Sequence, residues 1–192
     1  MKKVLLHICC GVCALHCINC LKEDGLYVEG FYFNPNIHPE SEYQKRKTVV
    51  EQLKEICSIK INEGKYKNDD WFASCRAYSD EPEGGRRCLL CYRMRLAETL
   101  NIARKLNFNY ITTTLTISPH KSSKEIITLG KELAGDIFLD ADFKKQDGFK
   151  KTTELAKKYN FYRQNYCGCV YSFRSQIPDD RSKKIEDRRQ KS

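Results

Sequence analysis

Residues 4–20 read VLLHICCGVCALHCINC, an apolar run followed directly by five cysteines. The apolar stretch 4–8 predicts a strand, and the pattern over 14–23 predicts a helix that ends near Gly25. A buried strand that passes through a short turn into a helix is the repeating unit of a parallel sheet. The turn itself would carry Cys9, Cys10 and Cys13.

The same alternation continues along the chain. Further strands are expected at 27–33, 59–62, 109–117 and 136–140, and further helices at 40–57, 69–78, 89–106, 122–133 and 150–159. This order implies parallel strands joined by right-handed crossovers, with helices on both faces of the sheet. The sequence thus predicts an α/β fold, a three-layer sandwich around a mostly parallel open sheet. In such sheets ligands bind beyond the carboxyl ends of the strands, where the first three cysteines would lie.

The length suits one domain. A chain of 192 residues can bury about 70% of its unfolded surface, so it does not need disulfide cross-links to be stable. We expect a single α/β catalytic domain at residues 1–178 that carries a metal site. Residues 179–192 are charged and almost free of apolar side chains, which predicts a mobile tail.

Charge and hydropathy indicate the cellular compartment of the protein and the class of its binding partner. No signal peptide is visible, and no apolar run approaches the ~20 residues that span a bilayer, so we expect a cytoplasmic protein with no membrane contact. The 34 Lys+Arg against 25 Asp+Glu give a net charge of +9, which favours a polyanionic partner such as nucleic acid. Solvated helix faces would account for the same surplus.

The eleven cysteines are the strongest chemical signal. Thiols stay reduced in the cytosol, so clusters of them indicate metal binding or redox chemistry. Thiolate is a soft ligand that selects zinc, copper(I) or iron–sulfur clusters. A closed zinc site uses four cysteines, so a larger set favours a cluster with a second metal. Seven cysteines form three groups at expected loops or element boundaries: Cys9, Cys10 and Cys13; Cys88 and Cys91; Cys167 and Cys169.

The remaining four cysteines have a simpler interpretation. Cys17 and Cys20 follow the first group at helical spacing, and we expect them on the buried face of that helix rather than as further ligands. Cys57 and Cys75 stand alone on helices and are also expected in the core. The charge of the arginines that precede Cys88, Arg86 and Arg87, is expected to lower the pKa of its thiol.

The chain resembles the QueH family of epoxyqueuosine reductases. The resemblance covers nearly everything before the tail, and the joint occurrence of its motifs in one order is specific. The matching stretches are HICCGVCA at 7–14, GFYFNPNIHPESEYQKR at 30–46, DEPEGGRRCLLCYRMRL at 80–96, TTTLTISPHKS at 112–122, DFKKQDGFKKTTELAKK at 142–158 and YRQNYCGCVYS at 162–172.

The resemblance implies a function and its cofactors. Members of this family reduce the epoxide of epoxyqueuosine, at the wobble position of the tRNA anticodon, to queuosine, the last step of queuosine biosynthesis. They are iron–sulfur oxidoreductases on an adenine-nucleotide-hydrolase-like (HUP-like) fold. For this chain we therefore expect a [4Fe-4S] cluster and an additional metal ion, iron, on the seven grouped cysteines. The substrate would be tRNA carrying epoxyqueuosine, and a ferredoxin- or flavodoxin-like protein would be the external electron donor.

A proton donor and substrate contacts are expected beside the cysteines. His38 is the candidate acid, because its unperturbed pKa suits proton transfer near neutrality. Asn34 and Asn36 are candidate contacts to the modified base, or they only shape a turn. Arg93 and Arg163 are the candidate substrate-binding cations. Further phosphate contacts are expected from Arg46, Arg86, Arg87, Arg95, Lys121, Lys150 and Lys151. Tyr92 and Phe149 are candidates for base stacking, and packing against the sheet is the alternative for each.

Two other classes of protein stay open. An ATP-dependent tRNA-modifying enzyme of similar fold would need a glycine- and serine-rich phosphate loop after the first strand. Residues 9–17 read CCGVCALHC instead, with one glycine and no serine. A zinc-bearing RNA-binding module would hold zinc and no iron.

Overall fold

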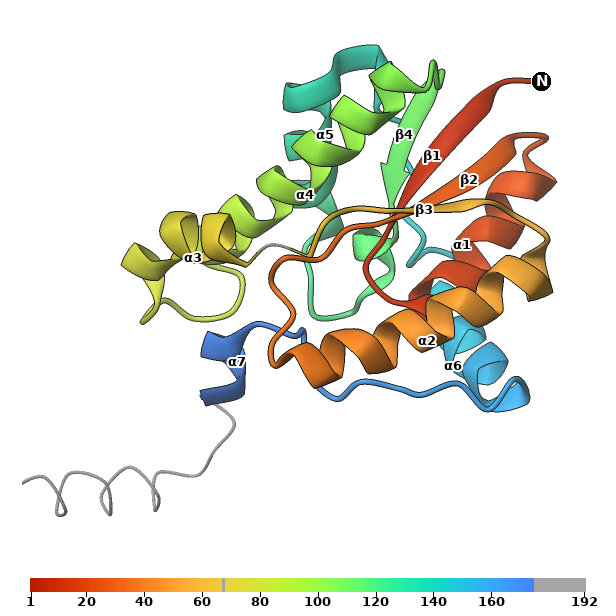
Figure 1. Cartoon of the computed structure of the whole chain (residues 1–192). Helices are drawn as coiled ribbons and strands as arrows, with labels where there is room; N and C mark the ends of the chain where they lie inside the picture. The colour runs from red at the N-terminus through yellow and green to blue at the C-terminus, as the bar shows by residue number, and fades with distance from the viewer. Residues whose placement is uncertain (67, 175–192) are drawn as a thin grey trace, which may run out of the picture.

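The computed structural model describes residues 1–66 and 68–174 (Figure 1). The predicted tail at 179–192 lies outside the described residues. The strands are β1 (Lys3–Ile8), β2 (Tyr27–Tyr32), β3 (Ile61–Glu63) and β4 (Tyr110–Thr113). The α-helices are α1 (Gly11–Glu23), α2 (Glu40–Cys57), α3 (Asp69–Cys75), α4 (Arg86–Lys105), α5 (Ser123–Ala134), α6 (Gly148–Lys158) and α7 (Val170–Arg174), and the 3₁₀ helices are η1 (Arg76–Tyr78), η2 (Thr114–Ile117) and η3 (Gly135–Ile137).

Within the described residues the strands form one parallel sheet in the order β3-β2-β1-β4. Val4 of the inner strand β1 lies opposite Val28 on one side and Tyr110 on the other. Residues 4–8 of β1 are fully buried, because this strand has a neighbour on each side and helices over each face. The predicted α/β class is confirmed.

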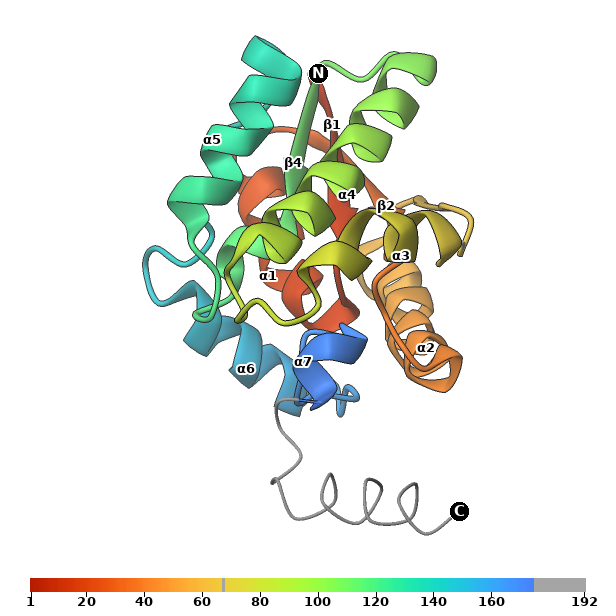
Figure 2. The same cartoon turned by 90° about the vertical axis from the view of Figure 1, so that its left-hand side faces the viewer.

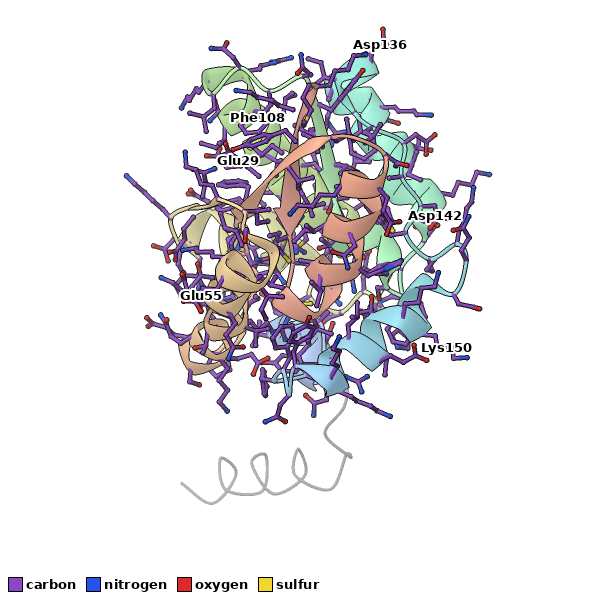
Figure 3. All side chains as sticks on the ribbon, turned by 90° about the vertical axis from the view of Figure 1, so that its right-hand side faces the viewer. Glu29, Glu55, Phe108, Asp136, Asp142 and Lys150 are labelled. Atoms are coloured by element: carbon purple, nitrogen blue, oxygen red, sulfur yellow. The ribbon has the colours of Figure 1, made fainter. Side chains whose placement is uncertain are left out.

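Helices cover both faces of the sheet. Figure 1 shows α1, α2 and α6 on one side of the strands and α4 and α5 on the other, and Figure 2 shows α4 in front of the strands with α5 beside it. Alternate residues of β1 serve the two layers: Leu6 and Ile8 pack in the core under α1 and α2, whereas Leu5 packs under α4 and α5. Figure 3 shows Glu55 of α2 and Lys150 of α6 directed outward from this core. The predicted three-layer sandwich is confirmed.

The strand order places a crevice at the carboxyl end of β1. The chain runs from β1 outward to β2 and β3 and then crosses back to β4 on the other side of β1. The connections after β1 and β4 therefore diverge at this end, the usual ligand site of an open α/β sheet. Here Cys9 follows β1 and Thr114 follows β4. The Cys9 N–H donates to Thr114 Oγ1 at 3.0 Å, and that hydroxyl lies 3.1 Å from Cys9 Sγ as a donor.

Two expected strands differ from the structure. The strand expected at 109–117 ends at Thr113, because its side-chain oxygen accepts a hydrogen bond from the N–H of Leu115 at 3.1 Å and turns the chain into η2. The strand expected at 136–140 is wrong: η3 begins there, and only one bridge joins Phe138 to Ile111 of β4. The Phe138 ring instead packs on Gly130 of α5, where a Cβ would lie 2.3 Å from the ring.

Two helices begin earlier than expected, which changes the expected surroundings of two cysteines. Helix α1 begins at Gly11 rather than at residue 14, and α4 begins at Arg86 rather than at residue 89. Cys13 and Cys88 therefore lie in the first turns of helices, not in loops. The short helix α7, which directly follows Cys169, was not expected. Among the described residues, no helix combines the length and the apolar character needed to cross a lipid bilayer.

Candidate metal centre

The first cysteine group lies where β1 passes into α1. Cys10 is the N-cap of α1, and Cys13 is in its first turn. The Sγ atoms of Cys9, Cys10 and Cys13 all lie within 4.8 Å of one another. Hydrogen bonds from Cys10 and Cys13, helped by the charge of Arg95 and the Thr114 hydroxyl, hold the pKa of Cys9 well below its usual value despite burial. The helix N-terminus also favours a thiolate, so this group suits one metal ion.

In the structure Cys88, Cys91, Cys167 and Cys169 come together from two distant segments, and from here on these four residues are called the second group. Cys88 and Cys91 lie at the start of α4, and Cys167 and Cys169 lie just before α7. All four line one cavity of about 30 Å³. Trp71 of α3 is fully buried against Cys91 and Cys169 and closes this side of the site. Four thiols around one cavity are the donor set of a zinc site or an iron–sulfur cluster.

Gly168 lets its two cysteine neighbours converge. Its φ is +95°, in the region that favours glycine, and a Cβ would lie 2.9 Å from Ile37 Cγ1. The N–H of Cys169 points to Cys167 Sγ at 3.4 Å. A hydrogen bond from the Cys169 thiol lowers the pKa of Cys167 to about 5, although burial opposes this. The turn therefore prepares one of its two sulfurs as a thiolate.

Helix α2 holds the segment 166–168 in place. Arg46 Nη1 donates to the carbonyl of Cys167 at 3.2 Å, and Nη2 donates to the carbonyl of Tyr166 at 2.9 Å. Its Nε forms an ion pair with Glu42 at 2.8 Å. Asn36 Nδ2 donates to the Cys167 carbonyl at 3.4 Å. These bonds fix the position of Cys167 and Cys169 against the body of the fold.

A larger cavity connects the two groups. It has a volume of about 460 Å³, and its lining includes Cys13 of the first group and Cys167 of the second. Cys167 lines both cavities, so the two groups border one another. The rest of the wall combines charge, amide and aromatic side chains, among them Glu83, His120, Lys121, Phe149, Arg163 and Gln164. The volume falls in the range of small-molecule sites.

Three arginines around the cysteines are buried. Arg46, Arg87 and Arg95 are 3%, 2% and 4% exposed, so the prediction that they contact tRNA phosphates is wrong. Within the described part of the chain, Arg87 and Arg95 form no ion pair with a carboxylate. Arg87 Nη1 donates instead to the carbonyls of Tyr78 and Ser79 at 3.0 and 2.8 Å. Since an unpaired buried cation is costly, nearby thiolates are the natural source of compensating charge.

The residues predicted at 34–38 lie in three different settings. Asn34 is buried and fully engaged: its Nδ2 donates to the Ile8 carbonyl at 2.9 Å, and its Oδ1 accepts from Arg95 at 2.5 Å. Asn36 lines the small cysteine cavity, and its buried Oδ1 has no hydrogen-bond partner among the described residues. His38 packs against the rings of Trp71 and Phe72, outside the linings of both cavities, and burial lowers its pKa.

The two predicted substrate-binding arginines separate. Arg163 lines the larger cavity beside the cysteines. Arg93 lies on the outer face of α4 and pairs with Glu132 of α5 at 3.3 Å, away from the cysteines. The aromatic candidates also separate, because Tyr92 is buried against the small cavity whereas Phe149 is 41% exposed and lines the larger one.

The environment of Cys88 differs from the expectation. Burial raises the pKa of its thiol, and the charge of Arg87 offsets this only in part. Arg86 points away and pairs with Glu81 at 2.5 Å. The expected lowering by Arg87 is therefore present, but burial outweighs it and the net shift of the Cys88 pKa is upward.

The other cysteines largely follow the core interpretation. Cys17, Cys57 and Cys75 are buried, as predicted, and Cys20 is half-buried beside His16, with its Sγ 3.5 Å from His16 Nε2. Cys75 packs directly against the second group, in the same buried cluster as Trp71.

The turn after β1 is not built to hold phosphate. Gly11 is needed for packing: a Cβ there would lie 2.5 Å from Val49 Cγ1 and 2.9 Å from the Val49 backbone carbon. The space in front of this helix start is occupied by thiols rather than by free N–H groups and hydroxyls. This geometry disfavours the ATP-dependent alternative.

Sequence reasoning missed two residues at the site. Gln164 Nε2 lies 2.9 Å from Cys10 Sγ, and Glu83 lines both cavities. Each stands within five residues of a grouped cysteine, at Cys167 and Cys88 respectively. Closeness to these motifs was the available signal, but only the fold shows which side chains turn toward the sulfurs.

Comparison with known proteins agrees with this geometry. The family model described as "Epoxyqueuosine reductase QueH" matches residues 4–175, a range that includes all seven grouped cysteines. The chain belongs to the QueH family. An epoxyqueuosine reductase QueH of Thermotoga maritima is 35% identical over 178 residues, covering 90% of this chain and 91% of the relative. The Streptococcus pyogenes protein of the same name is 35% identical over 182 residues, covering 90% of this chain and 71% of the relative. For the Acinetobacter baylyi QueH the identity is 35% over 176 residues, with 90% and 81% covered.

Proposed function

We propose that this chain reduces the epoxide of epoxyqueuosine in tRNA to the cyclopentene of queuosine, using an iron–sulfur centre held by its grouped cysteines. The reaction consumes two electrons and two protons and releases the epoxide oxygen as water. The observation that carries the proposal is that Cys9, Cys10 and Cys13 lie together, that Cys88, Cys91, Cys167 and Cys169 line one cavity, and that Cys13 and Cys167 line a further cavity in common. The name of the relatives supports the same activity.

The donor set fits an iron–sulfur centre. Thiolates are soft ligands, and this site has more of them than a closed zinc site can use. The seven cysteines would hold a [4Fe-4S] cluster and an adjacent metal ion, for which we propose iron. When bound, the cluster supplies electrons one at a time from an external ferredoxin- or flavodoxin-like donor. The buried charges of Arg87 and Arg95 support an anionic centre at this place.

The larger cavity is the proposed substrate site. Its volume of about 460 Å³ suits a nucleoside, and Phe149 offers an exposed ring on which a base can stack. Arg163 and Lys121 supply positive charge for the tRNA backbone at the same opening. Cys13 and Cys167 bring the metal centre to the wall of this cavity. For Asn36, the buried oxygen without a partner supports the proposed contact to substrate.

Protons must reach the same place. Glu83 and Lys121 line both cavities, so each can hold or pass a proton between solvent and the reacting oxygen. The predicted role of His38 as the acid stays a prediction, and its lowered pKa leaves less of the protonated form at neutral pH. Arg93 and Asn34 likewise stay predictions as substrate contacts.

The activity can be tested directly. The protein is purified anaerobically, its iron and sulfide are measured, and it is incubated with tRNA carrying epoxyqueuosine and dithionite. Nucleosides are then separated and identified by mass spectrometry. We expect iron, sulfide and queuosine. An intact cluster without queuosine would refute the activity, whereas a protein that holds only zinc and binds tRNA would support the RNA-binding module.

Matched cysteine variants connect the metal to the activity. Cys88→Ser removes a thiol that lines the small cavity, and we expect loss of most bound iron and of queuosine formation. Cys17→Ala removes a fully buried thiol of α1 that lines neither cavity in the described part of the chain. It should lower stability but retain iron and activity. Full iron content in Cys88→Ser would remove that residue from the ligand set.

A further inference from the structure

Arg95 is a buried cation between the two cysteine groups. It lies one helical turn after Cys91 on α4, is 4% exposed and lines the small cavity with the four cysteines of the second group. Its Nη1 lies 4.0 Å from Cys91 Sγ. Its charge also acts on Cys9 of the first group.

The two side chains that hold the Arg95 guanidinium, Asn34 and His7, are uncharged. Its Nη2 donates to Asn34 Oδ1 at 2.5 Å, and its Nε donates to His7 Nε2 at 3.3 Å. His7 lies 2.8 Å from Thr113 Oγ1 through its other ring nitrogen, so the strand ends of β1 and β4 both support the guanidinium. Among the described residues no carboxylate pairs with Arg95. The guanidinium is therefore held by neutral side chains, and no carboxylate of the described residues cancels its charge.

The position of this charge has a direct electrostatic consequence. Adding one electron to a thiolate-bound cluster adds one negative charge to the site. A fixed cation 4.0 Å from Cys91 Sγ stabilises that added charge, and it does so strongly because the guanidinium is buried. A carboxylate beside the cation would cancel the effect. The neutral side chain of Asn34, at the place where an ion pair would form, preserves it.

We propose that Arg95 is a positioning residue that raises the reduction potential of the bound centre by placing a positive charge, with no carboxylate of the described residues paired to it, between the two cysteine groups. This inference rests on the proposed iron–sulfur function. Asn34 and His7 act through Arg95, by holding its guanidinium. The arrangement makes the centre easier to reduce by an external one-electron donor.

The test is a redox titration of the holoprotein followed by electron paramagnetic resonance. Arg95→Gln removes the charge, and Arg95→Lys keeps it. We expect Arg95→Gln to lower the ratio of reduced to oxidised centre at the wild-type midpoint by at least about tenfold, which is 59 mV for a one-electron couple. Arg95→Lys should stay close to wild type. Arg104→Gln, an exposed site in the last turn of the same helix, is the control and should not shift.

A second variant keeps the test decisive if Arg95→Gln does not retain iron. Asn34→Asp leaves the guanidinium in place and adds a carboxylate beside it, so the potential should shift in the same negative direction. An unshifted potential in Asn34→Asp, or in iron-loaded Arg95→Gln, would overturn the proposal. An equal shift in Arg95→Lys and Arg95→Gln would also overturn it, because shape rather than charge would then matter. A wild-type protein without a reducible centre would instead refute the proposed function.

Discussion

Gly168 has a backbone conformation that a residue with a Cβ adopts only under strain. Its φ of +95° lets Cys167 and Cys169 face the same cavity, and Ile37 leaves no room for a side chain. Gly168→Ala should therefore destabilise the protein by roughly 1–2 kcal/mol and release bound iron. Gly25→Ala is the matched control, because Gly25 has a φ of +74° with open space around it, far along the chain from the grouped cysteines.

The measurement is iron per chain together with the melting temperature of both variants. We expect both to melt earlier than wild type, and only Gly168→Ala to lose iron. Full iron content in Gly168→Ala would show that the turn tolerates a side chain and does not position the sulfurs.

The lowered pKa of His38 predicts that the stability of the fold depends on pH. Burial lowers its pKa below the usual 6.5, and the bond to the Asn36 carbonyl offsets this only in part. As the pH falls through 6.5 the unfolded chain takes up a proton on His38 while the folded chain does not, so the free energy of unfolding decreases. His38→Gln should remove this component and lose less stability between about pH 7.5 and about pH 5.5 than wild type.

Thermal midpoints at the two pH values provide the check, with His120→Gln as a control at an exposed histidine. If wild type and His38→Gln lost stability equally on acidification, His38 would not be the group that titrates.

Individual roles were predictable from the sequence only where residue type and spacing carry the chemistry. The spacing of the cysteines at 88 and 91 and at 167 and 169, taken together with the first group, predicts a soft-metal site, and the structure places these four residues around one cavity. The burial of the arginines was not predictable, because each also bonds a residue far away in the sequence: Arg46 bonds Cys167, 121 positions away, and Arg95 bonds Asn34, 61 positions away. The sequence shows a positive charge at these positions but not that it is buried.

At the scale of elements, the start of α1 depends on a close approach to α2. A Cβ on Gly11 would lie 2.5 Å from the Val49 side chain and 2.9 Å from its backbone. Gly11→Ala must therefore push the two helices apart, and we expect a loss of about 1–3 kcal/mol. Asn19→Ala, an exposed site on the same helix, should change stability by less than about 0.5 kcal/mol.

Urea unfolding of the two variants measures this difference. Equal stability of Gly11→Ala and wild type would mean that α1 can shift without cost, and the position of Cys10 and Cys13 would then not depend on this contact.

Elements with a strong period were predictable, and those set by single contacts were not. Helix α2 was expected at 40–57 and is found at Glu40–Cys57, because its apolar period and charged face are regular. The stretch 109–117 has the residue types of a strand throughout, yet one side-chain bond of Thr113 ends β4 early. Phe138 likewise leaves the expected strand to pack on Gly130.

On the scale of the whole molecule, cysteines from three segments of the chain line two adjoining cavities. These cysteines stand at the beginnings of three helices: Cys9 and Cys10 before α1, Cys88 in the first turn of α4, and Cys169 directly before α7. Helix N-termini favour negative charge, although burial outweighs this effect at Cys88 and raises the pKa of its thiol. The parallel topology alone would bring the first group to the crevice at the carboxyl end of β1. Cys167 and Cys169 reach it only because the chain returns there before α7.

The larger cavity predicts how substrate affinity responds to a single change. Phe149 is exposed at the cavity wall and is proposed to stack on the modified base. Phe149→Ala should weaken binding of the tRNA by about 1–3 kcal/mol, seen as a raised KM, without loss of iron. Tyr27→Ala removes another exposed ring, at the amino end of β2 and the opposite end of the sheet, and serves as control.

Steady-state kinetics with tRNA carrying epoxyqueuosine separates the two variants. An unchanged KM in Phe149→Ala would place the base elsewhere, and an equal effect in Tyr27→Ala would indicate general destabilisation.

The central claim is that distant cysteine sulfurs converge on an iron–sulfur centre at the crevice of the sheet. X-ray absorption at the iron edge, on protein purified anaerobically without added metal, tests it most directly. The account predicts iron surrounded mainly by sulfur, with iron neighbours at the short distance of a cluster. Zinc in place of iron, or iron with oxygen and nitrogen ligands and no iron neighbour, would contradict it.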